Sequence, residues 1–140
     1  MDFVVDSSVV MSWAFEDESS RYAESVLDSL RHAEAVVPVI WPLEVANVLS
    51  VAGRRGRLTR TDQHQFLALV HELPIEVSTR QLSIREALDT ARECDLSAYD
   101  ASYLELARIT AVPLATLDTR LRDAADRSGV GVWLGECAGG

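Results

Sequence analysis

The sequence predicts an α/β fold with a mostly parallel sheet of four to five short strands, covered by helices on both faces. Short runs of β-branched residues alternate with longer segments whose apolar residues recur every three to four positions. Such alternation forms parallel sheets through right-handed crossovers. The chain has 140 residues, of which 48% are hydrophobic, so we expect one domain over residues 1–140 with a sizeable core.

The first elements are a buried strand that begins at Phe3 and a helix over residues 9–15. The strand ends on Asp6, and Ser7 and Ser8 can cap the helix. A second helix starts at Ser19 or Ser20 and continues to about residue 31. A second strand then covers residues 35–38, where a proline stops it.

The middle of the chain predicts two helices and a third strand. Pro42 suits the first turn of a helix over residues 43–54, which ends near Gly53 or Gly56. A further helix over residues 61–73 precedes a strand at 75–78. The sequence does not say which of the two helices crosses the sheet.

The last third of the chain repeats this pattern. Helices are predicted over residues 81–94 and 97–110, a strand over 113–117, a helix over 118–127 and an edge strand over 130–133, with a frayed terminus at Gly139 and Gly140. Again two helices separate two strands. All the strands would share one carboxyl edge, where α/β proteins place their binding crevice.

Composition narrows the class of protein. The apolar runs are shorter than the roughly 20 residues of a membrane helix, and Asp2 stands where a signal peptide would be basic, so we expect a cytoplasmic protein without a membrane partner. Cys94 and Cys137 lack metal-binding spacing. The net charge of −9 argues against a sequence-independent nucleic-acid coat but does not exclude a nuclease.

Four acids stand at strand ends or helix starts: Asp6, Glu44, Asp100 and Asp118. Each could act only as a helix cap or first-turn acid. Glu44 and Asp100, however, share the apolar stripes of their helices, where an unpaired charge costs several kcal/mol. If the four meet at one edge, a divalent cation best relieves their repulsion, and their hard oxygens favour magnesium or manganese.

The histidines are weaker candidates for metal ligands. His32, His64 and His71 lie in or next to predicted helices among polar residues. We therefore expect them at the surface.

Four short motifs carry a family resemblance: Val4–Ser8, Pro42–Asn47, Leu96–Ala101 and Leu114–Asp118. With these motifs in this order the chain resembles the PIN-domain ribonucleases, and most closely the VapC-type toxins of bacterial toxin–antitoxin pairs. The resemblance implies a three-layer α/β/α fold, a homodimer and an antitoxin partner. It assigns the four acids to metal binding, and Ser8 and Thr116 to supporting contacts with water or phosphate.

The predicted activity is metal-dependent endonucleolytic cleavage of RNA. A divalent ion would offset the negative charge of the phosphodiester and activate water, leaving 5′-phosphate and 3′-hydroxyl ends. The basic residues Arg54, Arg55 and Arg57 could hold RNA phosphates, or they could only cap a helix and solvate a loop.

Three alternatives stay open from the sequence. The chain could be a non-catalytic interaction module with the same fold. It could be a phosphotransferase phosphorylated on Asp6, although it contains no lysine to neutralise an acyl phosphate. Within the nuclease interpretation, cleavage of DNA is a further possibility.

Overall fold

A computed structural model, which describes residues 1–18 and 20–135, contains a four-stranded parallel sheet. The strands are β1 (Phe3–Val5), β2 (Ala35–Val37), β3 (Ile75–Val77) and β4 (Leu114–Ala115), in the order β3-β2-β1-β4. The predicted parallel α/β fold is confirmed. Because β1 lies between β2 and β4, the residue that follows β1 is next to the carboxyl ends of both neighbours.

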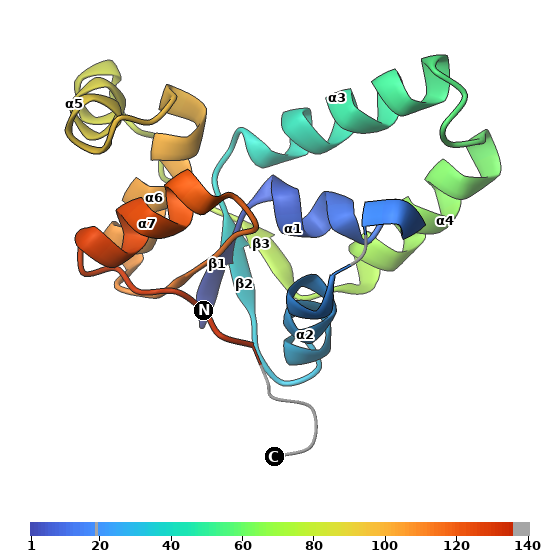
Figure 1. Cartoon of the computed structure of the whole chain (residues 1–140), viewed down its shortest axis with the longest axis horizontal. Helices are drawn as coiled ribbons and strands as arrows, with labels where there is room; N and C mark the ends of the chain where they lie inside the picture. The colour runs from blue at the N-terminus through green and yellow to red at the C-terminus, as the bar shows by residue number, and fades with distance from the viewer. Residues whose placement is uncertain (19, 136–140) are drawn as a thin grey trace.

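Helices cover both faces of this sheet. Figure 1 shows α5, α6 and α7 on one side and α1, α2, α3 and α4 on the other, so the three-layer arrangement is also confirmed. The bounds are α1 (Ser7–Ser12), the short 3-10 helix η1 (Glu16–Glu18), α2 (Arg21–Ser29), α3 (Trp41–Arg54), α4 (Arg60–Glu72), α5 (Ile84–Cys94), α6 (Ala98–Thr110) and α7 (Thr119–Arg127).

The helix pairs between strands resolve the question that the sequence left open. In Figure 1, α3 runs outward from the sheet and α4 returns beside it. A capping box fixes the start of α4, because the Thr59 side chain accepts from the backbone of Asp62 and the Asp62 side chain accepts from the backbone of Thr59. In the second pair, α5 packs on α6, and α6 contacts β1 and β4.

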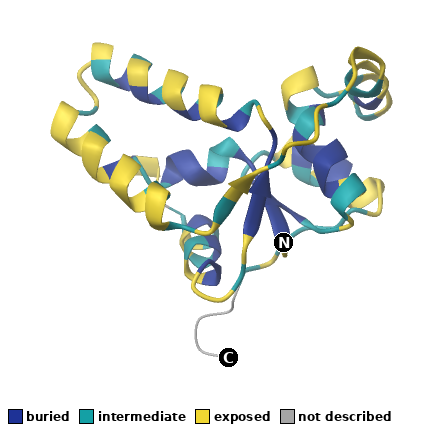
Figure 2. Cartoon of the chain, turned by 180° about the vertical axis from the view of Figure 1, so that it is seen from behind, coloured by how far each residue is buried: buried dark blue, intermediate teal, exposed yellow. Residues whose placement is uncertain are grey.

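The core is centred on β1. Phe3, Val4 and Val5 have no exposed surface, and Figure 2 shows this strand and its neighbours as the most buried part of the molecule. The Trp133 ring stacks on Phe3 with 4.5 Å between ring centroids. Burial of β1 on both faces holds the residue after it, Asp6, in a fixed position.

Two sequence expectations were wrong. Residues 130–133 form no strand, and only Val132 makes an isolated bridge to Leu114. Gly129 and Gly131 have positive φ angles of 73° and 87°, which interrupt extended backbone. In addition, α1 begins earlier than predicted and is capped by Asp6 instead of Ser7 or Ser8.

Some expectations fall outside the described residues, namely those on Ser19, Cys137, Gly139 and Gly140. Cys94 is a half-buried free thiol. In the described part of the chain, no helix has the length and apolar character needed to cross a membrane.

Candidate active site

Asp6 lies directly after β1 and is only 4% exposed. Its Oδ1 accepts hydrogen bonds from the Ser8 hydroxyl at 2.5 Å and from the Val9 N–H at 3.3 Å, which caps α1. Its Oδ2 accepts from the Thr116 hydroxyl at 2.5 Å. Asp6 is therefore a helix cap, which is one of the roles that the sequence allowed for it. Its carboxylate is also held rigidly at the sheet edge.

Two hydroxyl groups tie the ends of β1 and β4 together. The Thr116 hydroxyl, besides donating to Asp6, accepts from the Asp118 N–H at 3.0 Å. The Ser8 hydroxyl likewise accepts from the Leu117 N–H at 3.0 Å. Residues about 110 positions apart thus form one network because β4 pairs with β1. Ser8 and Thr116, which the resemblance assigned to contacts with water or phosphate, thus contact the carboxylate of Asp6.

Asp118 begins α7 at the edge of the same network. Its Oδ1 accepts from the Leu121 N–H at 3.1 Å, so it too is a helix cap. Its side chain is partly exposed, unlike that of Asp6.

Glu44 and Asp100 come from the first turns of α3 and α6. Glu44 is half-buried beside the buried face of its helix, which Trp41 and Val45 occupy, and so lies next to the apolar stripe. Asp100 is also half-buried, and its backbone N–H donates to the Ser97 hydroxyl at 3.1 Å. The hydroxyl of Tyr103 donates a hydrogen bond to Glu44 Oε1.

The electrostatic effects connect these acids. The pKa of Asp6 is raised to about 6, mainly by burial, and the charge of Asp100 also contributes to raising this pKa. The pKa of Glu44 is raised by burial and by Asp100, while that of Asp100 is raised by burial and by Asp118. Asp100 therefore interacts with each of the other three acids, and the four gather at one edge.

This set of donors fits a hard divalent cation in its chemistry. Carboxylate oxygens are the ligands that magnesium and manganese prefer, and a cation would offset the charge that burial and mutual repulsion penalise. Within residues 1–18 and 20–135, no three acidic, histidine or cysteine side chains lie close enough to form a ready-made metal cluster. The fit of these four acids to a divalent cation thus depends on the type of donor atom and on their charge. Their assignment as metal ligands stays a prediction.

The sequence matches the family profile of the PIN domain over residues 3–127, which include all four acids. The chain belongs to the PIN-domain family. It is 27% identical over 125 residues to "Ribonuclease VapC3" of Pyrobaculum aerophilum, covering 88% of this chain and 94% of the relative. The resemblance to PIN-domain and VapC proteins is thereby confirmed.

The fold of this PIN domain is also similar to a solved structure. The crystal structure of PAE2754 from Pyrobaculum aerophilum superposes with a TM-score of 0.69, with 23% sequence identity, over 89% of this chain and 84% of that chain. At this identity the similarity is one of fold.

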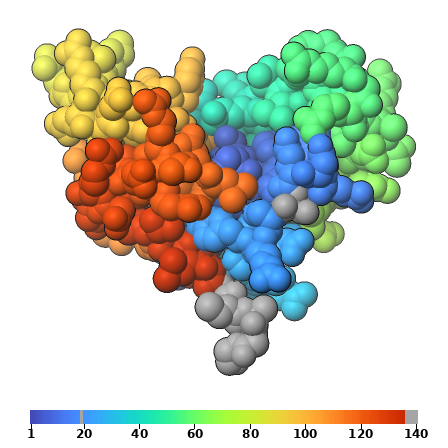
Figure 3. All heavy atoms as spheres, viewed as in Figure 1, coloured from blue at the N-terminus to red at the C-terminus, as the bar shows by residue number. Residues whose placement is uncertain are grey.

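The surface above the acids of the PIN domain is indented. Figure 3 shows the first residues of the chain, in blue, between the orange side formed by α6 and α7 and the teal α3. His64 and His71 are exposed on α4, and His32 is exposed in the turn after α2.

Arg122, a residue that sequence reasoning missed, brings a positive charge near this edge. It lies one turn after Asp118 and donates from Nη2 to the Thr116 carbonyl at 3.1 Å. Its guanidinium carbon is 5.6 Å from the centroid of the Tyr22 ring. The only sequence signal was an arginine four positions after an acid, which is a common surface pattern.

The three arginines proposed for substrate contact lie at the far end of α3. Arg54 and Arg55 are exposed there. Arg57 has other partners: its Nη2 is 3.3 Å from Asp17 and 3.6 Å from Glu18, and its guanidinium carbon is 4.2 Å from the centroid of the Phe15 ring. Arg57 is thus less available to RNA than its two neighbours.

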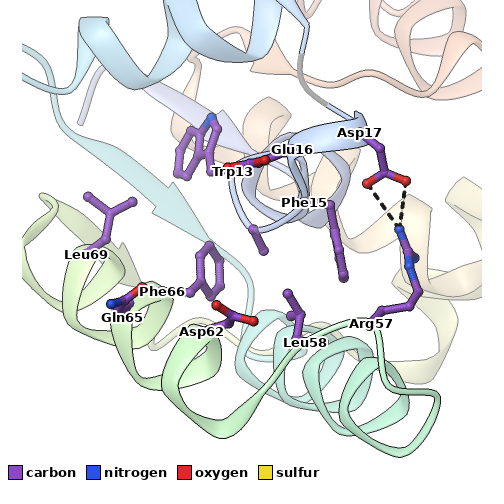
Figure 4. A pocket seen from close by; sticks show the side chains of 11 residues that line it. Trp13, Phe15, Glu16, Asp17, Arg57, Leu58, Asp62, Gln65, Phe66 and Leu69 are labelled. Atoms are coloured by element: carbon purple, nitrogen blue, oxygen red, sulfur yellow. Dashed lines mark hydrogen bonds and ion pairs between the residues drawn. The ribbon is translucent and has the colours of Figure 1, made fainter.

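A separate hollow of the described surface lies apart from the acids. It measures about 720 Å³ and lies between η1 and α4. Figure 4 shows Phe15, Leu58 and Phe66 around it, with the Arg57–Asp17 ion pair at one side. None of the four acids lines it, so the candidate active site is the open indentation and not this hollow.

Proposed function

We propose that this PIN domain is a metal-dependent endoribonuclease, the toxin of a type II toxin–antitoxin pair. The observation that carries the proposal is the electrostatic coupling of Asp100 to Asp6, Glu44 and Asp118 at the carboxyl edge of the sheet. Buried and half-buried acids that repel one another are typical of a functional site that a cation completes. The similarity to a curated relative named as a ribonuclease supports the same conclusion.

The chain's own residues perform distinct tasks in this proposal. Magnesium or manganese would be held by the four acids Asp6, Glu44, Asp100 and Asp118. When bound, the ion supplies a positive charge that offsets the negative charge of the phosphodiester and activates water. Ser8 and Thr116 keep the Asp6 carboxylate in one orientation through hydrogen bonds of 2.5 Å each. In this proposal water attacks the phosphorus and the bond to the 3′ oxygen breaks, so the expected products are a 5′-phosphate and a 3′-hydroxyl.

Substrate contact is assigned to exposed arginines. Arg54 is the last residue of the helix that begins near Glu44, and Arg55 and Arg57 follow its end. Arg54 and Arg55, with a smaller part for Arg57, would bind phosphates of an RNA strand that extends along α3. A guanidinium group binds phosphate through two parallel hydrogen bonds, which suits this role.

The remaining parts of the proposal concern the cell. A toxin of this kind would act in the cytoplasm as a homodimer, as one domain over residues 1–140, and would be inhibited by a cognate antitoxin protein. The VapC name of the curated relative supports the antitoxin partner, and the other assignments follow from the family resemblance.

The test is cleavage of a total cellular RNA pool by the purified chain in magnesium, beside Asp6→Asn and a sample with chelator. We expect new RNA ends only with the wild type and metal, and end-group analysis should find 5′-phosphates. A 2′,3′-cyclic phosphate product, or equal cleavage by Asp6→Asn, would contradict the proposal. Intact RNA in all samples, together with capture of a partner protein by the folded chain, would favour a non-catalytic module.

A further inference from the structure

Tyr103 is a buried polar residue to which the proposed chemistry gives no role. Its side chain is only 1% exposed, among the largest fully buried side chains of the molecule. It lies on α6 three residues after Asp100, so both residues are on the same face of that helix. A buried phenolic hydroxyl needs a hydrogen-bond partner, and the identity of that partner is informative.

The Tyr103 hydroxyl connects the elements that carry three of the acids. It donates a hydrogen bond to Glu44 Oε1 on α3. The side chain of Ser7, which directly follows Asp6 at the start of α1, also lowers the pKa of this hydroxyl. One hydroxyl on α6, beside Asp100, is thus bonded to Glu44 on α3 and lies near the start of α1.

Glu44 needs such a restraint more than the other acids. Asp6 and Asp118 are fixed as helix caps by backbone N–H groups, whereas Glu44 has a longer side chain and is half-exposed. The neighbouring charge of Asp100 repels it. Ordering a glutamate side chain costs up to about 2 kcal/mol of rotamer entropy, so an unrestrained Glu44 would turn toward solvent.

The hydrogen bond restrains Glu44 without using up its carboxylate. Tyr103 contacts Oε1 alone, and Oε2 stays available as a ligand. The aromatic ring itself is packed in the core with Leu104 and Ala107, which gives the hydroxyl a fixed position. A rigid donor of this kind is what orients a flexible ligand residue toward a metal.

We propose that Tyr103 is a positioning residue, whose hydroxyl holds the Glu44 carboxylate beside Asp100 and thereby raises the affinity of the site for a divalent cation. The proposal depends on the proposed metal-dependent function. It assigns Tyr103 no contact with the RNA or with the cation, since it acts through Glu44.

The test is the affinity for Mn²⁺, measured on the full chain by the paramagnetic signal of free Mn²⁺ during a titration. Tyr103→Phe removes the hydroxyl and keeps the ring, and we expect the dissociation constant to rise about 10-fold. Tyr22→Phe is the matched control, because the Tyr22 hydroxyl donates to the Trp133 carbonyl at 2.5 Å and not to an acid. This control should bind Mn²⁺ within about twofold of the wild type, because it leaves the geometry of the proposed ligands unchanged.

A double-mutant cycle separates positioning from general destabilisation. In a Glu44→Ala background, Tyr103→Phe should weaken Mn²⁺ binding no further, because its effect passes through the missing carboxylate. Additive effects in the cycle, or a wild-type affinity of the single variant Tyr103→Phe, would overturn the inference. If the wild type itself binds no Mn²⁺, the proposed metal site fails, and this inference fails with it.

Discussion

Replacing Asp6 by asparagine should stabilise the metal-free protein at neutral pH, although it removes a candidate catalytic group. Burial raises the pKa of Asp6 from 3.8 to about 6 in the folded chain. Well below its unfolded pKa of 3.8 the carboxyl is protonated in both the folded and unfolded states and has no effect on stability. As the pH rises from there through the folded pKa, the wild type loses stability, because folding then buries a charge.

The size of this loss follows from the two pKa values. The difference between 3.8 and about 6 corresponds to about 3 kcal/mol of unfolding free energy, fully lost above the folded pKa. Asp6 is 4% exposed, so solvent does little to reduce the effect. Asparagine can accept from Ser8 and Val9 and donate toward Thr116, as the protonated acid can. The variant should therefore match the wild type at pH ~3 and exceed it by up to about 3 kcal/mol at pH ~8.

The assay is urea unfolding followed by circular dichroism at acidic and alkaline pH, with a chelator present throughout. Asp89→Asn, which alters an exposed acid on α5, is the control and should show no comparable change with pH. A stability difference between Asp6→Asn and the wild type that stays constant across this pH range would refute the reasoning that the Asp6 charge destabilises the fold.

Three further predictions use simple measurements. Thr116→Val, which loses hydrogen bonds to Asp6 and from the Asp118 N–H, should lower the unfolding free energy by about 1–3 kcal/mol in urea, and an unchanged value would contradict the network. Arg54→Ala with Arg55→Ala should weaken RNA binding and reduce the slope of log affinity against log salt by about 1.4; equal binding at several salt concentrations would refute their role. Millimolar Mg²⁺ should raise the wild-type Tm at pH ~8 but not at pH ~4, where Asp6, whose pKa is raised to about 6, is protonated; no rise at either pH would argue against the site.

Local patterns in the sequence predicted most of the fold. Runs such as Phe3–Val5 and Ala35–Val37 are short, apolar and β-branched, and each became a strand of the parallel sheet. The strand expected at residues 130–133 failed because two glycines with positive φ flank Val130 and the Trp133 ring packs on Phe3. Propensity alone does not report such tertiary packing.

The candidate site was harder to predict than the fold because it depends on strand order. The sequence placed Asp6 at a strand end but could not show that β4 would pair with β1 and bring Thr116 to its carboxylate. In the sequence, Tyr103 is only one residue of the apolar stripe that Asp100 shares. A tyrosine one turn after Asp100 was the available signal that a buried hydroxyl would need a partner, and only the packing of α6 near α3 identified that partner as Glu44.

The central claim is that the acids gathered around Asp100 perform the cleavage. Its most direct test is the rate at which Asp100→Asn cleaves cellular RNA in magnesium, compared with the wild type and Asp89→Asn. The account predicts a rate at least about 100-fold lower for Asp100→Asn, and a rate within about twofold of the wild type for Asp89→Asn. A wild-type rate for Asp100→Asn, with folding confirmed by circular dichroism, would show that the reaction takes place elsewhere on the chain.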